Sequence, residues 1–411
     1  MPPTLKKRVG QSPTLQDLQA RRLRYSEGYL YFILEKTSIY VHNARMRIII
    51  TGTVGLDKAN FLERVERLAE QGGHEMTVCH VGERMYAEAP DVAPGRILDL
   101  PLARLHQLRR SVFKDILALA QDKKNLVVNT HATFRWKHGL FPAFDFDQLA
   151  QFDADLYVCL MDNVDALHGR LLEHNVDHSL KDLLVWREEE TLATEMMMMG
   201  CSLQRSGPPA KFHALALGRD NSTALTLCRL MFQPQIRKAY LSFPMTHVTE
   251  LSEVQKEIKR FRQSMGKHFA IFDPSDLEEQ QLYLNAVAAS EQGQKVMEVE
   301  VLGEPMRFDV TEIMRVAGDI HAQIYARDFM LIDQADMIIS YIPELPEGKP
   351  GLSSGVEREL QHAYEATREV FVIWRPKVQP SPFVTETATK VFSTIEESLE
   401  YFEKGGYLEN Q

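Results

Sequence analysis

The sequence predicts an α/β protein with two open, parallel-sheet domains, and three observations lead to that prediction. Short apolar runs alternate with helical stretches, the pattern of a parallel sheet covered by helices. A chain of 411 residues is too long for one ordinary core. The pattern also restarts after Gln233-Pro234-Gln235, where proline breaks a helix. We therefore expect domains at residues 46–232 and 237–411, preceded by an extension over residues 1–45.

The extension begins with a polar, basic stretch and becomes richer in aromatic and β-branched residues at positions 29–41. That composition favours one or two strands packed on the following domain, and a partner-binding arm is the alternative. In the first domain, the apolar run 47–51 precedes Gly52, and apolar residues then recur at helical spacing. A strand, a glycine turn and a helix are expected there. The other strands of this domain are expected at residues 77–81, 126–130, 156–161 and 212–217.

The second domain repeats this alternation. A strand at residues 238–243 is followed by a helix whose apolar positions are Leu251, Val254, Ile258, Phe261 and Met265. The next strand lies near residues 269–272. Later strands at 337–342 and 370–374 flank a helix from about 354 to 367, which predicts another open α/β sheet.

The composition argues against several classes of protein. The formal net charge of −10 argues against a surface that coats nucleic acid. The four cysteines are far apart and lack a paired metal spacing, so they are expected to be reduced. No apolar run approaches the roughly 20 residues that span a bilayer, and the N-terminus lacks a secretory pattern. We expect a cytoplasmic protein without a membrane partner.

The first glycine turn has the position of a phosphate-binding loop. Gly52, Gly55 and Lys58 lie between a buried strand and the start of a helix, whose free N–H groups favour anions. However, Asp57 stands where such a loop has its next glycine, and Ala59 replaces the Ser or Thr that holds magnesium. The loop is therefore a degenerate form of the motif.

Residues 46–230 resemble adenylate-kinase-type nucleoside monophosphate kinases. The resemblance rests on this loop and on four further segments, 82–89, 129–131, 141–144 and 160–165. It implies a phosphate-contacting Lys58 and a lid that carries Arg170 and Arg187. Asn129 stands where the family commonly has an acidic residue. Three readings stay open: an active magnesium-dependent kinase, a domain that senses a nucleotide with or without magnesium, and a purely structural domain.

Polar residues of the second domain gather where its strands end, which is where open α/β sheets bind ligands. Four segments carry them: 239–245, 325–328, 332–339 and 352–363. The last contains Gly355-Val356, then Glu359-Leu360, then Ala363. Asp328 and Ala335-Asp336 precede it.

In this order the segments resemble the nucleoside 2-deoxyribosyltransferase family, including its branch of deoxynucleoside monophosphate N-glycosidases. The likeness covers about residues 238–374. It implies a Rossmann-like, flavodoxin-like domain in which Glu359 is the nucleophile. By the same resemblance Tyr240 orients this carboxylate, and Asp328 donates a proton to the leaving base or positions it. We expect Glu359 to lie in the first turn of its helix and to be ionised at neutral pH.

The resemblance also supplies a substrate-binding set. Ser353, Ser354 and Gly355 are expected to bind a 5′-phosphate, and a simple serine N-cap is the alternative. Phe243, at the turn after the first strand, and Asp336 complete the set. For Asp336 a turn residue without chemistry is the alternative. Glu357 and Arg358 replace residues that are small or apolar in the family.

The function expected from the sequence is cleavage or exchange of the N-glycosidic bond of a nucleoside or nucleotide. It needs no metal or other cofactor, and the kinase-like domain serves in sensing or regulation. The partner is a small molecule, and a homo-oligomer is expected because such transferases complete their sites across subunits. The alternatives are a nucleoside monophosphate kinase with an appended binding domain and a non-enzymatic nucleotide-sensing regulator.

Overall fold

The computed structural model describes residues 45–408, except 175, 177, 219–221, 246–247, 249–250 and 302. The strands expected at residues 29–41 lie outside the described residues. Residues Met46–Gln411 form one compact unit. The predicted division at residues 232–237 stays a prediction, although a second sheet does begin at Lys238.

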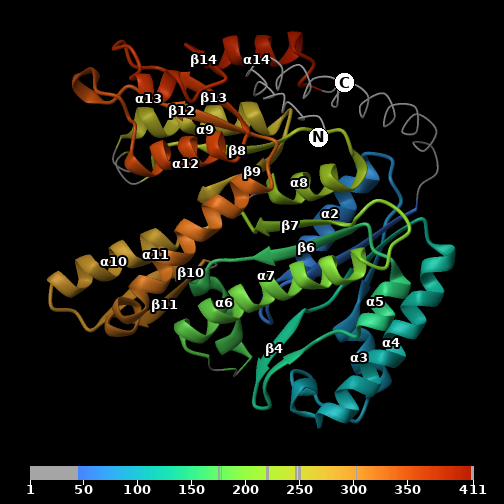
Figure 1. Cartoon of the computed structure of the whole chain (residues 1–411). Coiled ribbons are helices and arrows are strands. Elements are labelled where there is room, and N and C mark those ends of the chain that lie inside the picture. The colour runs from blue at the N-terminus through green and yellow to red at the C-terminus, as the bar shows by residue number, and fades with distance from the viewer. Residues whose placement is uncertain are drawn as a thin grey trace, which may run out of the picture. The chain divides into compact units, whose positions relative to one another are not determined.

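The first sheet has five parallel strands in the order β2-β3-β1-β6-β7, and Figure 1 shows β6 beside β7. The strands are β1 (Met46–Thr51), β2 (Thr77–His80), β3 (Asn125–Asn129), β6 (Leu156–Met161) and β7 (Lys211–Ala216). Its helices are α2 (Lys58–Gln71), α3 (Val81–Glu88), α4 (Leu102–Asp122), α5 (Phe146–Phe152), α6 (Val164–Glu173), α7 (Leu180–Ser202) and α8 (Ser222–Phe232). An antiparallel hairpin of β4 (Thr133–Trp136) and β5 (Gly139–Pro142), which the sequence did not predict, follows β3.

The second sheet also has five parallel strands, in the order β14-β13-β12-β8-β9. They are β8 (Lys238–Ser242), β9 (Ala270–Phe272), β12 (Met337–Ile342), β13 (Glu369–Trp374) and β14 (Lys390–Phe392). Counted within this sheet, the order is that of the flavodoxin-like fold. The two open parallel sheets confirm the predicted fold class.

The helices of this half are α9 (Ser252–Gly266), α10 (Glu279–Glu291), α11 (Val310–Asp333), α12 (Ser354–Glu365), α13 (Pro382–Thr385) and α14 (Ile395–Lys404). Between α10 and α11 lies an unpredicted antiparallel hairpin, β10 (Val296–Val301) and β11 (Glu304–Asp309). Asp328 lies inside the 24-residue helix α11, which the regular recurrence of buried apolar residues from Val310 to Ile332 sustains.

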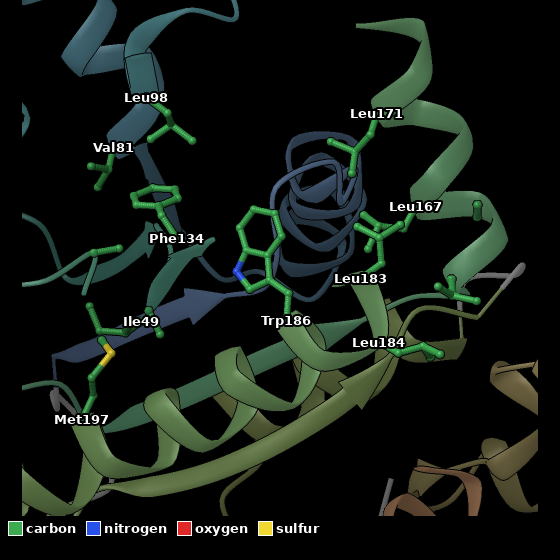
Figure 2. Close-up of a cluster of buried hydrophobic side chains, with 14 of the residues drawn as sticks. Ile49, Val81, Leu98, Phe134, Leu167, Leu171, Leu183, Leu184, Trp186 and Met197 are labelled. Carbon is green, nitrogen blue, oxygen red and sulfur yellow. The ribbon is translucent and has the colours of Figure 1, made fainter. Parts of the chain in front are cut away.

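Helix α7 is central to the core. Figure 2 shows Trp186 between Phe134 of β4 and the α6 residues Leu167 and Leu171. Trp186 is fully buried, and the same hydrophobic cluster continues to Ile313 of α11. Helices α10 and α11 of the second half thus share a core with the first sheet.

Candidate active site

The candidate site lies where the order of the second sheet reverses. Strands β8 and β12 are hydrogen-bonded neighbours, but the chain leaves β8 toward β9 on one side and β12 toward β13 on the other. The segments that follow them therefore diverge and leave a crevice at the carboxyl ends of the strands. Helix α12, which follows β12, places Glu359 there.

Glu359 is a buried carboxylate with both oxygens bound. Its residue exposure is 8 %. Tyr240 Oη donates to Glu359 Oε1 at 3.1 Å, and Ser242 Oγ donates to Oε2 at 2.5 Å. The tyrosine contact is the one that the family resemblance implies. The two hydroxyls fix the plane of the carboxylate, and its role as a nucleophile stays a prediction.

The expected ionisation of Glu359 needs correction. Helix α12 begins at Ser354, so Glu359 lies in the second turn, beyond the N-terminal amides that favour an anion. Burial, and to a smaller extent the charge of Asp328, raise the pKa of Glu359 to about 8, against the opposing hydrogen bonds from Ser242 and Tyr240. In the free protein Glu359 is therefore mostly protonated at pH 7.

Asp328 is the second carboxyl of the site. It is 8 % exposed and lies near the end of α11. Burial raises the pKa of Asp328 to about 6, while Arg327 beside it lowers this pKa. The two environments thus give the pair unequal affinities for protons, and at pH 7 the pair holds about one proton, mainly on Glu359.

A cavity of about 1650 Å³ opens over these carboxyls. Its walls include Phe243, Arg327, Ser353, Ser354 and Gly355, and α9 contributes Lys256 and Lys259. Typical small-ligand pockets measure about 300 to 1,000 Å³. This cavity has room for a whole nucleotide.

Ser353, Ser354 and Gly355 lie in the cavity wall, at the start of α12. Ser353 is the N-cap, because its Oγ accepts a hydrogen bond from Val356 N at 3.2 Å. The N-cap that was the alternative reading is therefore present. The phosphate-binding role stays a prediction.

The structure does not bring Asp336 to the cavity. Asp336 precedes β12, at the opposite end of that strand from the crevice. Its carboxylate accepts from Lys238 N at 2.9 Å and from Lys238 Nζ at 2.7 Å. These bonds join the beginnings of two neighbouring strands, so we leave Asp336 out of the candidate site.

Ser242 was not among the residues expected from the sequence. It is fully buried, and Ser340 of β12 lies beside it with 3.4 Å between the two Oγ atoms. The two-residue alternation of side chains along a strand could have identified it. Residues two apart point to the same side, so the hydroxyl of Ser242 had to lie beside that of Tyr240.

The glycine turn of the first half is occupied by the protein's own groups. Glu190 of α7 is fully buried. Its carboxylate accepts hydrogen bonds from Gly52 N at 3.0 Å, Ala132 N at 2.8 Å, and Thr133 N and Oγ1 at 2.7 Å each. An internal anion thus takes the place near Gly52 N that the motif offers to a phosphate.

Lys58 is also engaged internally. Its Nζ donates to Gly52 O at 2.8 Å and to Thr130 O at 2.6 Å, and it lies 3.2 Å from His131 Nδ1. Burial lowers the pKa of Lys58 to about 8. The ammonium therefore ties the loop to the end of β3.

The two glycines of the turn have structural reasons to be glycine. Gly52 has φ 142° and Gly55 has φ 88°, which L side chains rarely adopt. A Cβ on Gly52 would lie 2.8 Å from Leu160 O, and one on Gly55 would lie 2.8 Å from Leu171 Cγ.

The two arginines expected on a lid are held by carboxylates. Arg170 Nη1 donates to Asp162 Oδ2 at 2.8 Å. Arg187 is 7 % exposed and its Nη2 donates to Glu279 Oε2 of α10 at 3.0 Å. Arg170 Nη1 also donates to Gly55 O of the glycine turn at 3.4 Å, whereas Arg187 binds Glu279 of the second half. The nucleotide-binding assignments of Gly52, Gly55, Lys58, Arg170 and Arg187 stay predictions.

The described part of the chain shows neither a metal site nor a membrane-spanning helix. No group of three or more His, Cys, Asp or Glu side chains there is arranged to hold a metal ion. None of the helices described is both long and apolar enough to cross a membrane.

No protein-family model matches the chain, and no curated protein matches it. Among solved structures, a 2-deoxyribosyltransferase from the psychrotolerant bacterium Bacillus psychrosaccharolyticus is similar to part of it. The match has 17 % identity and a TM-score of 0.25, and covers 42 % of this chain and 98 % of that one.

Proposed function

We propose that the protein cleaves or exchanges the N-glycosidic bond of a nucleoside or nucleotide, with Glu359 as the nucleophile. The observation that carries this proposal is the pair of carboxyls, Glu359 and Asp328, in a cavity at the reversal point of a parallel sheet. Glycosidic chemistry uses two carboxyl groups in different protonation states, and burial has given these two different pKa values.

In the first step Glu359 Oε attacks the anomeric carbon, and the bond from that carbon to the base nitrogen breaks. The bonding electron pair leaves with the base, which takes a proton from Asp328. In the second step water, or another base, attacks the anomeric carbon, gives one proton to Asp328, and displaces Glu359 as its carboxylate. Tyr240 and Ser242 hold the carboxylate so that one oxygen faces the sugar through both steps.

The reaction needs Glu359 ionised and Asp328 protonated, the reverse of their main state in the free protein at pH 7. Moving one proton between the two carboxyls gives the reactive form, and the net charge of the site does not change. Only the minor form reacts, so this mechanism predicts a slow enzyme or a substrate that shifts the proton as it binds.

Release of free base from a panel of deoxynucleosides, deoxynucleotides and NAD, followed by chromatography, tests the proposal. The wild-type protein should release base from at least one compound, and Glu359→Gln should release none above background. Ser398→Ala, which truncates a fully buried serine of α14, is the matched control and should keep its activity. No release by the wild type, or equal release by Glu359→Gln, would refute the proposal.

A further inference from the structure

Four buried charged residues form a row from α7 to the cavity. They are Arg187, Glu279, Arg327 and Asp328, with exposures of 7 %, 1 %, 6 % and 8 %. They come from three helices, α7, α10 and α11. Two are cations and two are anions, and they alternate along the row. Buried charges are costly unless paired, so the position of each one depends on its neighbours.

The pair Arg187–Glu279 is held more tightly than Arg327 and its two carboxylate neighbours. Arg187 presents two nitrogens to the carboxylate of Glu279: Nη2 donates to Oε2 at 3.0 Å, and Nη1 donates to Oε1. Val164 N also donates to Glu279 Oε1, at 3.1 Å. Gln323 Oε1 accepts from Arg187 Nε at 3.1 Å. This is a two-pronged arginine–carboxylate pair, which fixes both orientation and distance.

Arg327 is held less tightly, between two carboxylates. Its Nη1 lies 3.6 Å from Glu279 Oε2, and its Nε lies 3.4 Å from Asp328 Oδ1. Nη1 is buried and makes no hydrogen bond with the described residues. These distances are longer than those of the Arg187–Glu279 pair, and they place Arg327 between two carboxylates that compete for it.

Other charged or titratable groups also act on this row. Asp328 interacts electrostatically with Glu359 of α12 and with Tyr240 of β8. Glu279 interacts with Asp162 and Asp165 of the first half. Within the row, Arg327 is the cation that faces Asp328.

We propose that Arg187 and Glu279 are positioning residues for the proposed reaction, because together they set where Arg327 lies between Glu279 and Asp328, the carboxyl that protonates the leaving base. The inference rests on the proposed function for its catalytic meaning. It gives α7, a helix that packs against the first sheet, a part in the proposed glycosidic site. Arg187 anchors Glu279, Glu279 draws Arg327 away from Asp328, and the balance of these contacts sets how readily Asp328 gives up its proton.

The test uses the full chain with ¹³C-labelled aspartate carboxyls and follows the titration of Asp328 by NMR, with Asp328→Asn identifying its signal. Arg187→Gln removes a cation and leaves Glu279 to pair with Arg327 alone, so the pKa of Asp328 should rise. Glu279→Gln removes the competing anion, so this pKa should fall. At these separations each shift should be about 0.5 to 1 pH unit.

Two further variants complete the experiment. In the double variant Arg187→Gln with Glu279→Gln, Arg327 keeps Asp328 as its nearest anion, so the pKa of Asp328 should fall below the wild-type value. Arg187→Lys keeps the charge and should stay near wild type. The pKa values should therefore run from Arg187→Gln, the highest, through wild type and the double variant to Glu279→Gln, the lowest. Loss of packing alone would not give shifts of opposite sign.

Far-UV circular dichroism and melting temperature establish that each variant is folded. If a single variant does not fold, the double variant, in which two neutral amides face each other, still tests the proposal. Shifts of the same sign in both single variants, or no fall in the double variant, would overturn it. The titration needs no substrate. An absence of base release with the expected order of pKa values would defeat the proposed function and leave the row of charges standing.

Discussion

Ser242→Ala tests the geometry of the site most sharply, because it removes one hydroxyl that donates directly to Glu359. The bond from Ser242 Oγ to Glu359 Oε2 is 2.5 Å long and fully buried, and it stabilises the ionised form of the carboxyl. Hydrogen bonds to charged groups are worth about 1.5–3 kcal/mol, and 1.36 kcal/mol corresponds to one pH unit. The substitution should therefore raise the pKa of Glu359 by about 1 to 2 from its value of about 8.

The assay is the pH dependence of kcat/KM for base release. Activity requires one proton on the Glu359–Asp328 pair, so the upper limb of the profile follows the loss of that last proton. In Ser242→Ala this limb should move to higher pH by the same amount as the pKa of Glu359, and activity at pH 7 should fall about 10- to 100-fold.

Two serine truncations serve as controls. Ser398→Ala creates a similar small cavity in α14, the helix that follows the edge strand β14. Because β13 separates β14 from β12, this substitution should leave the upper limb in place. Ser340→Ala removes a neighbour of Ser242 that does not touch Glu359, so its effect should be smaller than that of Ser242→Ala. An unmoved upper limb in folded Ser242→Ala, or an equal shift in Ser398→Ala, would refute this reasoning.

Three further predictions follow from the contacts described. For the wild-type protein, kcat/KM should be bell-shaped with limbs near pH 6 and pH 8, since the pair is doubly protonated below and fully ionised above that range; a profile flat from pH 5 to 9 would contradict it. Asp328→Asn should slow release of purine or pyrimidine bases by about 10²- to 10⁴-fold but spare a nitrophenyl glycoside, whose leaving group needs no proton, and steady-state rates on both compare them. Glu190→Gln should lower the free energy of unfolding by about 3 kcal/mol in urea titration, because an amide cannot accept all four hydrogen bonds of the buried carboxylate; a loss no larger than that of an exposed Glu253→Gln control would count against the role given to Glu190.

The sheets could be predicted because their strands are buried on both faces. Such strands appear as short continuous apolar runs, as in residues 156–161 and 337–342, and helices between them keep a separate period. The hairpin β10–β11 was missed for the opposite reason. Its exposed side carries Glu298, Glu300 and Arg307, so it has no continuous apolar run, and the adjoining polar stretch resembles a loop.

The candidate site was predicted in part. The order of motifs placed Tyr240, Asp328 and Glu359 together, and the structure does bring Tyr240 and Glu359 into contact. The protonation state of Glu359 was not predictable from the sequence, because its pKa depends on how completely the fold removes the carboxyl from water. The contact between Glu190 and the glycine turn was not predictable from the sequence either. It lies 138 positions from Gly52, and only the packing of α7 against the first sheet brings the two together.

The central claim, that Glu359 attacks the sugar, is tested most directly by mass spectrometry of the protein quenched during turnover. The account predicts a transient mass increase equal to the glycosyl group, located by peptide mapping on Glu359 and absent from Glu359→Gln. Base release by the wild-type protein with no such adduct at any quench time, or with the adduct on another residue, would contradict it.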